Sequence, residues 1–134
     1  ANIEIMEHVG RENIVIFGLT AEEVAEKRAE GYNPREVIEG SRELCQAVNS
    51  IANGVFSPDE PTRYAGLMDA LYNSDWFMVA ADFDAYAAAQ RDVDARWEDR
   101  AAWRKSAIMN IANVGWFSSD RTIGEYAREI WGVK

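Results

Sequence analysis

The sequence predicts a predominantly α-helical chain with one or two short strands. Helix-capping residues recur along it, and the apolar residues between them repeat at helical spacing. Only residues 14–17, Ile-Val-Ile-Phe, form a clear β-branched and aromatic run. The length, 134 residues, indicates one domain or part of one.

The first elements are a short helical or irregular segment over residues 3–9 and a buried strand over residues 14–17, bounded by Asn13 and Gly18. A single strand cannot form a sheet, so this strand must pair with strands outside the chain. Thr20-Ala-Glu-Glu23 is a capping-box pattern that predicts the next helix.

The middle of the chain predicts three further helices. Asn33 and Pro34 open one, which Gly40 breaks, and Ser41 caps another that Gly54 ends. An amphipathic helix is then expected from the spacing of Tyr64, Leu67, Met68, Leu71 and Tyr72. Residues 75–81 are interpreted as a short strand or a buried turn.

Three helices are expected after residue 81. Asp82 should cap the first and Asp99 the second, which Gly115 stops. The last helix should begin near Ser119 or Asp120 and close at Gly132. If the segments on either side of Gly40 are counted as one broken helix, the expected fold is one strand and about six helices.

Composition limits the classes of partner. There are 14 basic against 23 acidic side chains, a net charge of −9, which repels nucleic acid and anionic lipid. We therefore expect neither nucleic-acid nor membrane partners, and the apolar run over residues 76–81 is too short to span a bilayer. The single cysteine, Cys45, is consistent with a reducing compartment such as the cytoplasm.

Titratable candidates have ordinary structural explanations. His8 lacks the spacing of a metal site, and Cys45, which follows Leu44, is interpreted as a small buried hydrophobe. A catalytic carboxylate pair could come from a group of six acidic residues, but capping and solvated helix faces explain them better: Asp82, Asp84, Asp92, Asp94, Glu98 and Asp99.

Asp120 and Arg121 precede a helix and could hold an anion, although a capping cluster with Arg121 paired to a neighbouring element is favoured. Core packing explains Trp97, Trp103 and Trp131, whereas Trp76 and Trp116 are expected to contact something outside the chain. The lysines, Lys27, Lys105 and Lys134, lack an apolar setting. We therefore expect no catalytic, cofactor-binding or metal-ligating residue.

Taken together, an ordered series of motifs resembles the C-terminal end of the glycogen, starch and maltodextrin phosphorylases. The clearest is Phe-Ser-Ser-Asp-Arg-Thr-Ile at 117–123, followed by Glu-Tyr-Ala-Arg-Glu-Ile-Trp at 125–131. The remaining segments lie, in order, at 1–5, 12–19, 31–34, 54–58, 81–90 and 110–112. Trp116 departs from the family, in which a basic or small residue is commoner.

The resemblance implies a glycosyltransferase of the GT-B kind, in which two Rossmann-like α/β domains face a cleft. Residues 1–134 would be a single partial domain, the C-terminal part of the second, cofactor-binding domain. The final helix, 120–131, would cross toward the other domain. Such enzymes attack terminal α-1,4-glucosidic bonds with inorganic phosphate, release α-glucose 1-phosphate, and are usually cytoplasmic homodimers.

In this family pyridoxal phosphate is bound to a lysine, and its phosphate group does the acid/base work. No lysine here matches that lysine, whose segment should precede Ala1. The resemblance therefore implies an inactive piece with no cofactor bound, whose partners are the rest of the phosphorylase chain and, in the parent enzyme, α-glucan and phosphate.

Two alternative functions remain open from the residues alone. One is a freestanding acidic helical interaction module, and the other is a carbohydrate-binding piece that uses Trp76 and Trp116. In an isolated piece, we also expect residues 14–17 or Trp131 to expose apolar surface and drive self-association, giving a homo-oligomer.

Overall fold

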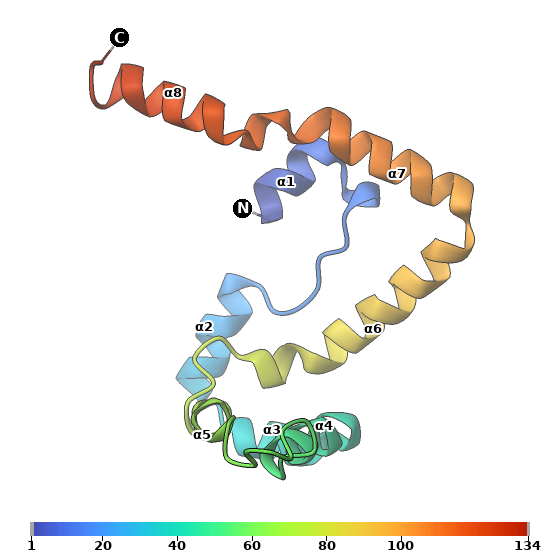
Figure 1. The fold of residues 1–134 in the computed structure, drawn as a ribbon, viewed down its shortest axis with the longest axis vertical. Helices are drawn as coiled ribbons and strands as arrows, with labels where there is room; N and C mark the ends of the chain where they lie inside the picture. Colours follow the sequence, from blue (N-terminus) through green and yellow to red (C-terminus); the bar gives the residue numbers. More distant parts are fainter. Residues whose placement is uncertain (1, 134) are drawn as a thin grey trace. The chain divides into compact units, whose positions relative to one another are not determined.

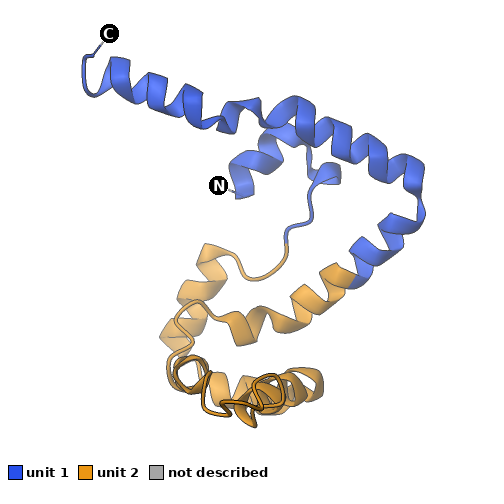
Figure 2. Cartoon of the chain, in the orientation of Figure 1, with its two compact units in different colours: residues 1–16, 91–134 blue, residues 17–90 orange. Residues whose placement is uncertain are grey.

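A computed structural model describes residues 2–133, and these residues form helices joined by turns and irregular segments, with no strand among them (Figure 1). The predicted helical class is confirmed. The chain divides into two compact units, drawn in separate colours in Figure 2. Unit 1 comprises residues 1–16 and 91–134, and unit 2 comprises residues 17–90.

Residues 14–17 form no strand within the described part of the chain, so their predicted pairing with strands outside the chain stays a prediction. Ile14 has extended dihedral angles, φ −139° and ψ 148°, but the segment pairs with no neighbouring strand. No hydrogen bond within residues 2–133 engages the backbone of residues 15–17. A strand is defined by its hydrogen-bonded ladder, so β-type side chains without a paired backbone do not make residues 14–17 a strand.

Unit 2 begins with α2 (Ala21–Glu30), and its predicted capping box is confirmed. The Thr20 hydroxyl accepts a hydrogen bond from the Glu23 N–H at 3.3 Å, and the Glu23 carboxylate accepts one from the Thr20 N–H at 2.7 Å. At the other end Gly31, at φ 90°, donates its N–H to the last turn. Both ends of α2 are therefore determined by nearby residues.

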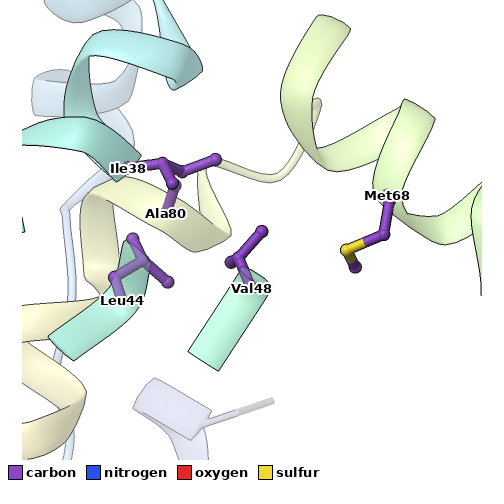
Figure 3. Close-up of a cluster of buried hydrophobic side chains, with 5 residues drawn as sticks. All are labelled: Ile38, Leu44, Val48, Met68 and Ala80. Carbon is purple, nitrogen blue, oxygen red and sulfur yellow. The ribbon is translucent and has the colours of Figure 1, made fainter. Parts of the chain in front are cut away.

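Three more helices of unit 2 enclose its apolar core. They are α3 (Pro34–Gly40), capped by Asn33; α4 (Arg42–Ala52), capped by Ser41; and α5 (Ala65–Asn73). With the start of α6 (Val79–Glu98) they bury the five side chains of Figure 3: Ile38, Leu44, Val48, Met68 and Ala80. Met68, one of the residues whose spacing predicted an amphipathic helix, is buried here, whereas Leu67 of the same set is 58% exposed.

The predicted start of α6 at Asp82 is wrong. Residues 75–78 form a turn, one of the two predicted alternatives, and the helix begins at Val79. Asp75 caps it by accepting the N–H groups of Val79 and Ala80, each at 2.9 Å. Asp82 instead accepts the N–H of Leu19 at 2.8 Å. A carboxylate in a first helical turn can bond a distant backbone group, which sequence spacing does not reveal.

Unit 1 contains α1 (Asn2–Val9), the short 3-10 helix η1 (Arg11–Asn13) and α7 (Arg100–Asn113), along with the second half of α6. α7 packs against α1 and η1, where Val9 is buried. Asp99 caps α7 as predicted, since its carboxylate accepts the N–H groups of Ala101 and Ala102.

The end of the chain differs from the prediction in its bounds. α7 stops at Asn113, before Gly115, and a second 3-10 helix, η2 (Val114–Phe117), leads into α8 (Ser119–Glu129). The final helix therefore does not extend over 120–131. The N–H groups of Ile130 and Trp131 both bond to the Tyr126 carbonyl, which ends the regular ladder. The count of six helices was low because α3 and α4 are two separate helices, and because α1, expected as a helical or irregular segment, is a regular helix.

Two of the three tryptophans assigned to the core lie at the surface. Trp97 is 43% exposed and Trp131 is 59% exposed, while Trp103 is half-buried. Trp97 packs edge-on against Trp103 at 5.1 Å, and the Arg100 guanidinium lies 3.5 Å from its ring centre. Helical spacing placed these rings on a common face but did not reveal whether that face is covered.

Candidate functional site

The most tightly bonded side chain of unit 2 is Asp75, which is only 5% exposed. Besides capping α6, its carboxylate accepts a hydrogen bond from the Tyr32 hydroxyl at 2.7 Å. Burial, together with that bond to Asp75, raises the pKa of Tyr32 above its ordinary value. Asp75 therefore joins the loop before α3 to the start of α6, a role that the sequence did not indicate.

This bonded carboxylate supports an exposed aromatic turn, Trp76 and Phe77. Both flanking residues have positive φ, 34° at Asp75 and 53° at Met78, which non-glycine residues adopt at a cost. The two rings are 68% and 81% exposed. The Arg28 guanidinium lies 4.6 Å from the Trp76 ring centre and donates to the Trp76 carbonyl at 2.6 Å. The expectation that Trp76 contacts a partner outside the chain stays a prediction.

Trp116 belongs to a different arrangement, in unit 1. His8 stacks on it with ring centroids 5.4 Å apart and meets Phe117 edge-on at 5.6 Å. The Arg121 guanidinium lies 3.8 Å from the Trp116 ring centre. His8 is exposed on α1, so the aromatic cluster joins α1 to η2 and the start of α8.

The Asp120–Arg121 pair shows no assembled anion site in the described residues. Arg121 forms an ion pair with Glu125 on the same helix and donates its Nε–H to the Trp116 carbonyl. The Ser118 side chain makes no capping hydrogen bond, and Asp120 is exposed. The favoured interpretation, a capping cluster with Arg121 paired to a neighbouring element, is wrong in both parts, because Ser118 makes no side-chain cap and Arg121 pairs within its own helix.

Four of the six acidic candidates make separate local contacts. Asp84 accepts from the Ser41 hydroxyl at 3.1 Å, and Asp92 pairs with Arg96 at 2.7 Å. Asp82 and Asp99 bond backbone N–H groups, as described above. Asp94 and Glu98 are exposed on α6. Within residues 2–133, no three His, Cys, Asp or Glu side chains gather closely enough to hold a metal ion.

Cys45 and the lysines show no reactive setting. Cys45 is half-buried against the core of unit 2, and the Asn49 side chain donates to its sulfur at 3.3 Å. Lys27 on α2 and Lys105 on α7 are exposed, whereas Lys134 lies outside the described residues. Neither described lysine has the apolar, desolvated setting of a Schiff-base lysine.

A cavity of about 780 Å³ lies in unit 1, between residues 12–15 and α7. Ile14 and Val15 line one side, and Trp103, Ala107 and Ile111 line the other. Asn110 spans the two sides by donating to the Asn13 carbonyl at 2.8 Å. Apolar side chains make up most of this groove, and Glu12, Arg96 and Asp99 also line it.

Known proteins resemble the chain along its whole length. A family model described as carbohydrate phosphorylase matches residues 1–133. The chain belongs to this family.

The chain is 46% identical to the glycogen phosphorylase of Haemophilus influenzae, 48% identical to the brain form of glycogen phosphorylase of Homo sapiens, and 46% identical to the glycogen phosphorylase of Synechocystis sp.. Each alignment covers 100% of this chain and 16% of the relative, so the chain spans about a sixth of the relatives' length. No helix in residues 2–133 combines the length and apolarity needed to cross a membrane.

Proposed function

We propose that this chain is the C-terminal part of a glycogen phosphorylase, an enzyme that cleaves terminal α-1,4-glucosidic bonds with inorganic phosphate to give α-glucose 1-phosphate. The observation that carries the proposal is the match of all 134 residues to glycogen phosphorylases at 43–48% identity. The comparisons give no support to the alternative of a freestanding interaction module.

The catalytic chemistry of the proposed enzyme lies outside this chain. The family resemblance implies pyridoxal phosphate bound to a lysine, but Lys27 and Lys105 are exposed and do not fit such a site. We therefore place the cofactor, and the groups that bind phosphate, in the remaining polypeptide. On this proposal the 134 residues complete the fold around that site and are inactive by themselves.

The unpaired backbone of residues 15–17 favours a position for these residues in the sheet of a Rossmann-like domain. Residues 15–17 expose backbone donors and acceptors that no described residue satisfies, and their side chains are apolar. Unpaired backbone groups in an extended apolar run recruit a neighbouring strand. We propose that the rest of the polypeptide supplies that strand, and that residues 1–134 form the last part of the second domain of a GT-B enzyme.

Hydrogen exchange tests this placement. The amides of residues 15–17 should exchange slowly in the complete polypeptide and rapidly in the isolated chain, because a ladder protects amides and an open extended segment does not. The helical amides of α4 provide an internal reference. Equal, fast exchange of residues 15–17 in both proteins would contradict the sheet placement.

The remaining features of the parent enzyme follow as proposals. α8 would pack against the first domain, the enzyme would form a homodimer, and it would work in the cytoplasm. The absence of a membrane-spanning helix in the described residues and the net charge of −9 agree with such a protein.

Activity measurements test the proposed reaction. The complete polypeptide, given glycogen, inorganic phosphate and pyridoxal phosphate, should release glucose 1-phosphate, and the 134-residue chain under the same conditions should release none. Deletion of these residues from the complete polypeptide should abolish the reaction. Release of glucose 1-phosphate by the 134-residue chain would contradict its proposed inactivity. A complete polypeptide that consumes no phosphate would contradict the proposed reaction.

A further inference from the structure

A second cavity lies in unit 2 and holds about 350 Å³. Its walls come from α3, the end of α4, the turn at residues 61–64, and α5. We call it the α5 pocket. Its volume falls in the range of about 300–1,000 Å³ that is usual for small-molecule sites. No role for this pocket follows from the motifs or the comparisons described above.

One edge of the α5 pocket is a linked chain of three planar polar side chains. Arg35 donates an Nη2–H to the Asn73 side-chain oxygen at 2.5 Å, and Asn73 donates to an Asp69 carboxylate oxygen at 2.7 Å. The Arg35 guanidinium also lies 5.1 Å from the Tyr72 ring centre. These contacts hold the three groups in place, while the second Asp69 oxygen and other Arg35 N–H groups bond no described residue.

The rest of the α5 pocket is apolar and aromatic. Met68 is buried at its base, Ile51 is half-buried beside it, and the half-buried Tyr64 and Tyr72 contribute their rings. Neither tyrosine hydroxyl nor the Thr62 hydroxyl bonds to any other described residue. The pocket therefore offers apolar faces with polar groups at their edges.

The charges select the class of ligand. Arg35 and Asp69 are the ionised side chains that line the pocket, so its formal charge is balanced. A phosphate would be attracted by Arg35 but repelled by Asp69. A neutral ligand whose hydroxyls both donate and accept would satisfy the two together. Its C–H faces would pack against the tyrosine rings. Sugars combine these properties.

We infer that the α5 pocket binds a neutral oligosaccharide, a short stretch of an α-1,4-glucan chain. The sugar class follows from the pocket, and the choice of an α-glucan rests on the proposed function. Asp69 and Arg35 accept from and donate to the sugar hydroxyls, Tyr72 packs against a sugar face, and Asn73 positions the two charged groups.

The test measures glucan affinity in the complete polypeptide. The unaltered protein and the variants Arg35→Ala and Asp69→Asn are run in native gels that contain increasing concentrations of glycogen. The decrease in their migration gives an apparent dissociation constant for each protein. Both residues are exposed, so the variants should fold; thermal midpoints check this. Arg42→Ala is the matched control, since Arg42 is an exposed arginine on α4 outside the pocket.

We expect each pocket variant to weaken the apparent affinity by about tenfold, the effect of losing a charged hydrogen bond, and Arg42→Ala to leave it unchanged. If glycogen slows both pocket variants in the gel as much as it slows the unaltered protein, the inference is wrong. The same result is expected if the remaining polypeptide covers the pocket, and it overturns the inference in that case too.

Phosphorolysis of maltoheptaose, measured alongside, separates this inference from the proposed function. If glycogen slows the complete polypeptide in the gel in an Arg35-dependent way, but maltoheptaose yields no glucose 1-phosphate, then the inference stands and only the proposed function is wrong.

Discussion

At the scale of single residues, the Asp75 carboxylate connects separate segments of unit 2, because it accepts hydrogen bonds from two backbone N–H groups and one hydroxyl. An acidic side chain that is 5% exposed is tolerated because its oxygens accept these three hydrogen bonds. Asp75 thereby ties the start of α6 to Tyr32 and maintains the conformation of the Trp76–Phe77 turn.

Replacement of Asp75 by alanine should destabilise unit 2 by about 2 kcal/mol, since the helix loses its N-cap and the Tyr32 hydroxyl loses its partner. Urea unfolding followed by circular dichroism measures the change. Asp94→Ala, at an exposed position on the same helix, is the control and should change stability by less than about 0.5 kcal/mol. Equal effects of the two substitutions would contradict the role given to Asp75.

The raised pKa of Tyr32 predicts that the free energy of unfolding decreases at alkaline pH. Its pKa in the folded chain is raised by burial and by Asp75, so folding favours the protonated phenol. The stabilisation is complete below the unfolded pKa of about 10 and is lost as the pH rises from there toward the folded pKa. Urea midpoints should fall over that interval, and by less in Tyr32→Phe. The prediction fails if both proteins show the same dependence.

At the scale of elements, helix starts follow from adjacent residues. Thr20, Asn33, Ser41 and Asp99 each accept an N–H two or three positions along the chain, as their sequence patterns indicated. α6 does not fit this scheme, because the turn before it places Asp75 four and five positions from the N–H groups that it accepts. Local pattern therefore located most helices and failed where the turn conformation decided the cap.

The end of α2 offers a second stability test. Gly31 has φ 90°, and a methyl group added at its Cα would meet no atom within 4 Å, so Gly31→Ala should cost about 1–2 kcal/mol from backbone conformation alone. Gly40, at the end of α3, has equally open surroundings without a positive φ. Gly40→Ala should be neutral or slightly stabilising. Chemical denaturation of both variants compares them directly.

At the scale of the whole molecule, the described residues leave much apolar surface uncovered. Phe17, Ile111 and Trp131 are 46%, 77% and 59% exposed, alongside several other large apolar side chains. Isolated domains rarely keep such a surface free of contacts. Its presence agrees with a chain that occupies about a sixth of its relatives' length.

The 134-residue chain should accordingly self-associate in solution. Sedimentation should show a concentration-dependent increase in mass, and the paired substitutions Ile16→Lys and Trp131→Ser should reduce it, because they remove apolar surface at two of the exposed regions. Glu30→Gln, at an exposed polar position, should have no effect. A monodisperse monomer across the accessible concentration range would show this expectation to be wrong.

The sequence by itself determined the helical class, most helix starts and the family resemblance, because caps and helical periodicity act over a few residues. Only the tertiary structure decided three features that join distant residues. They are the bond from Asp75 to Tyr32, 43 positions apart; the bond from Asp82 to Leu19, 63 apart; and the Arg35–Asn73 pair of the α5 pocket, 38 apart. Such pairs form only when packing brings distant segments together. A strand likewise needs a neighbouring strand, and no described residue supplies one to residues 14–17.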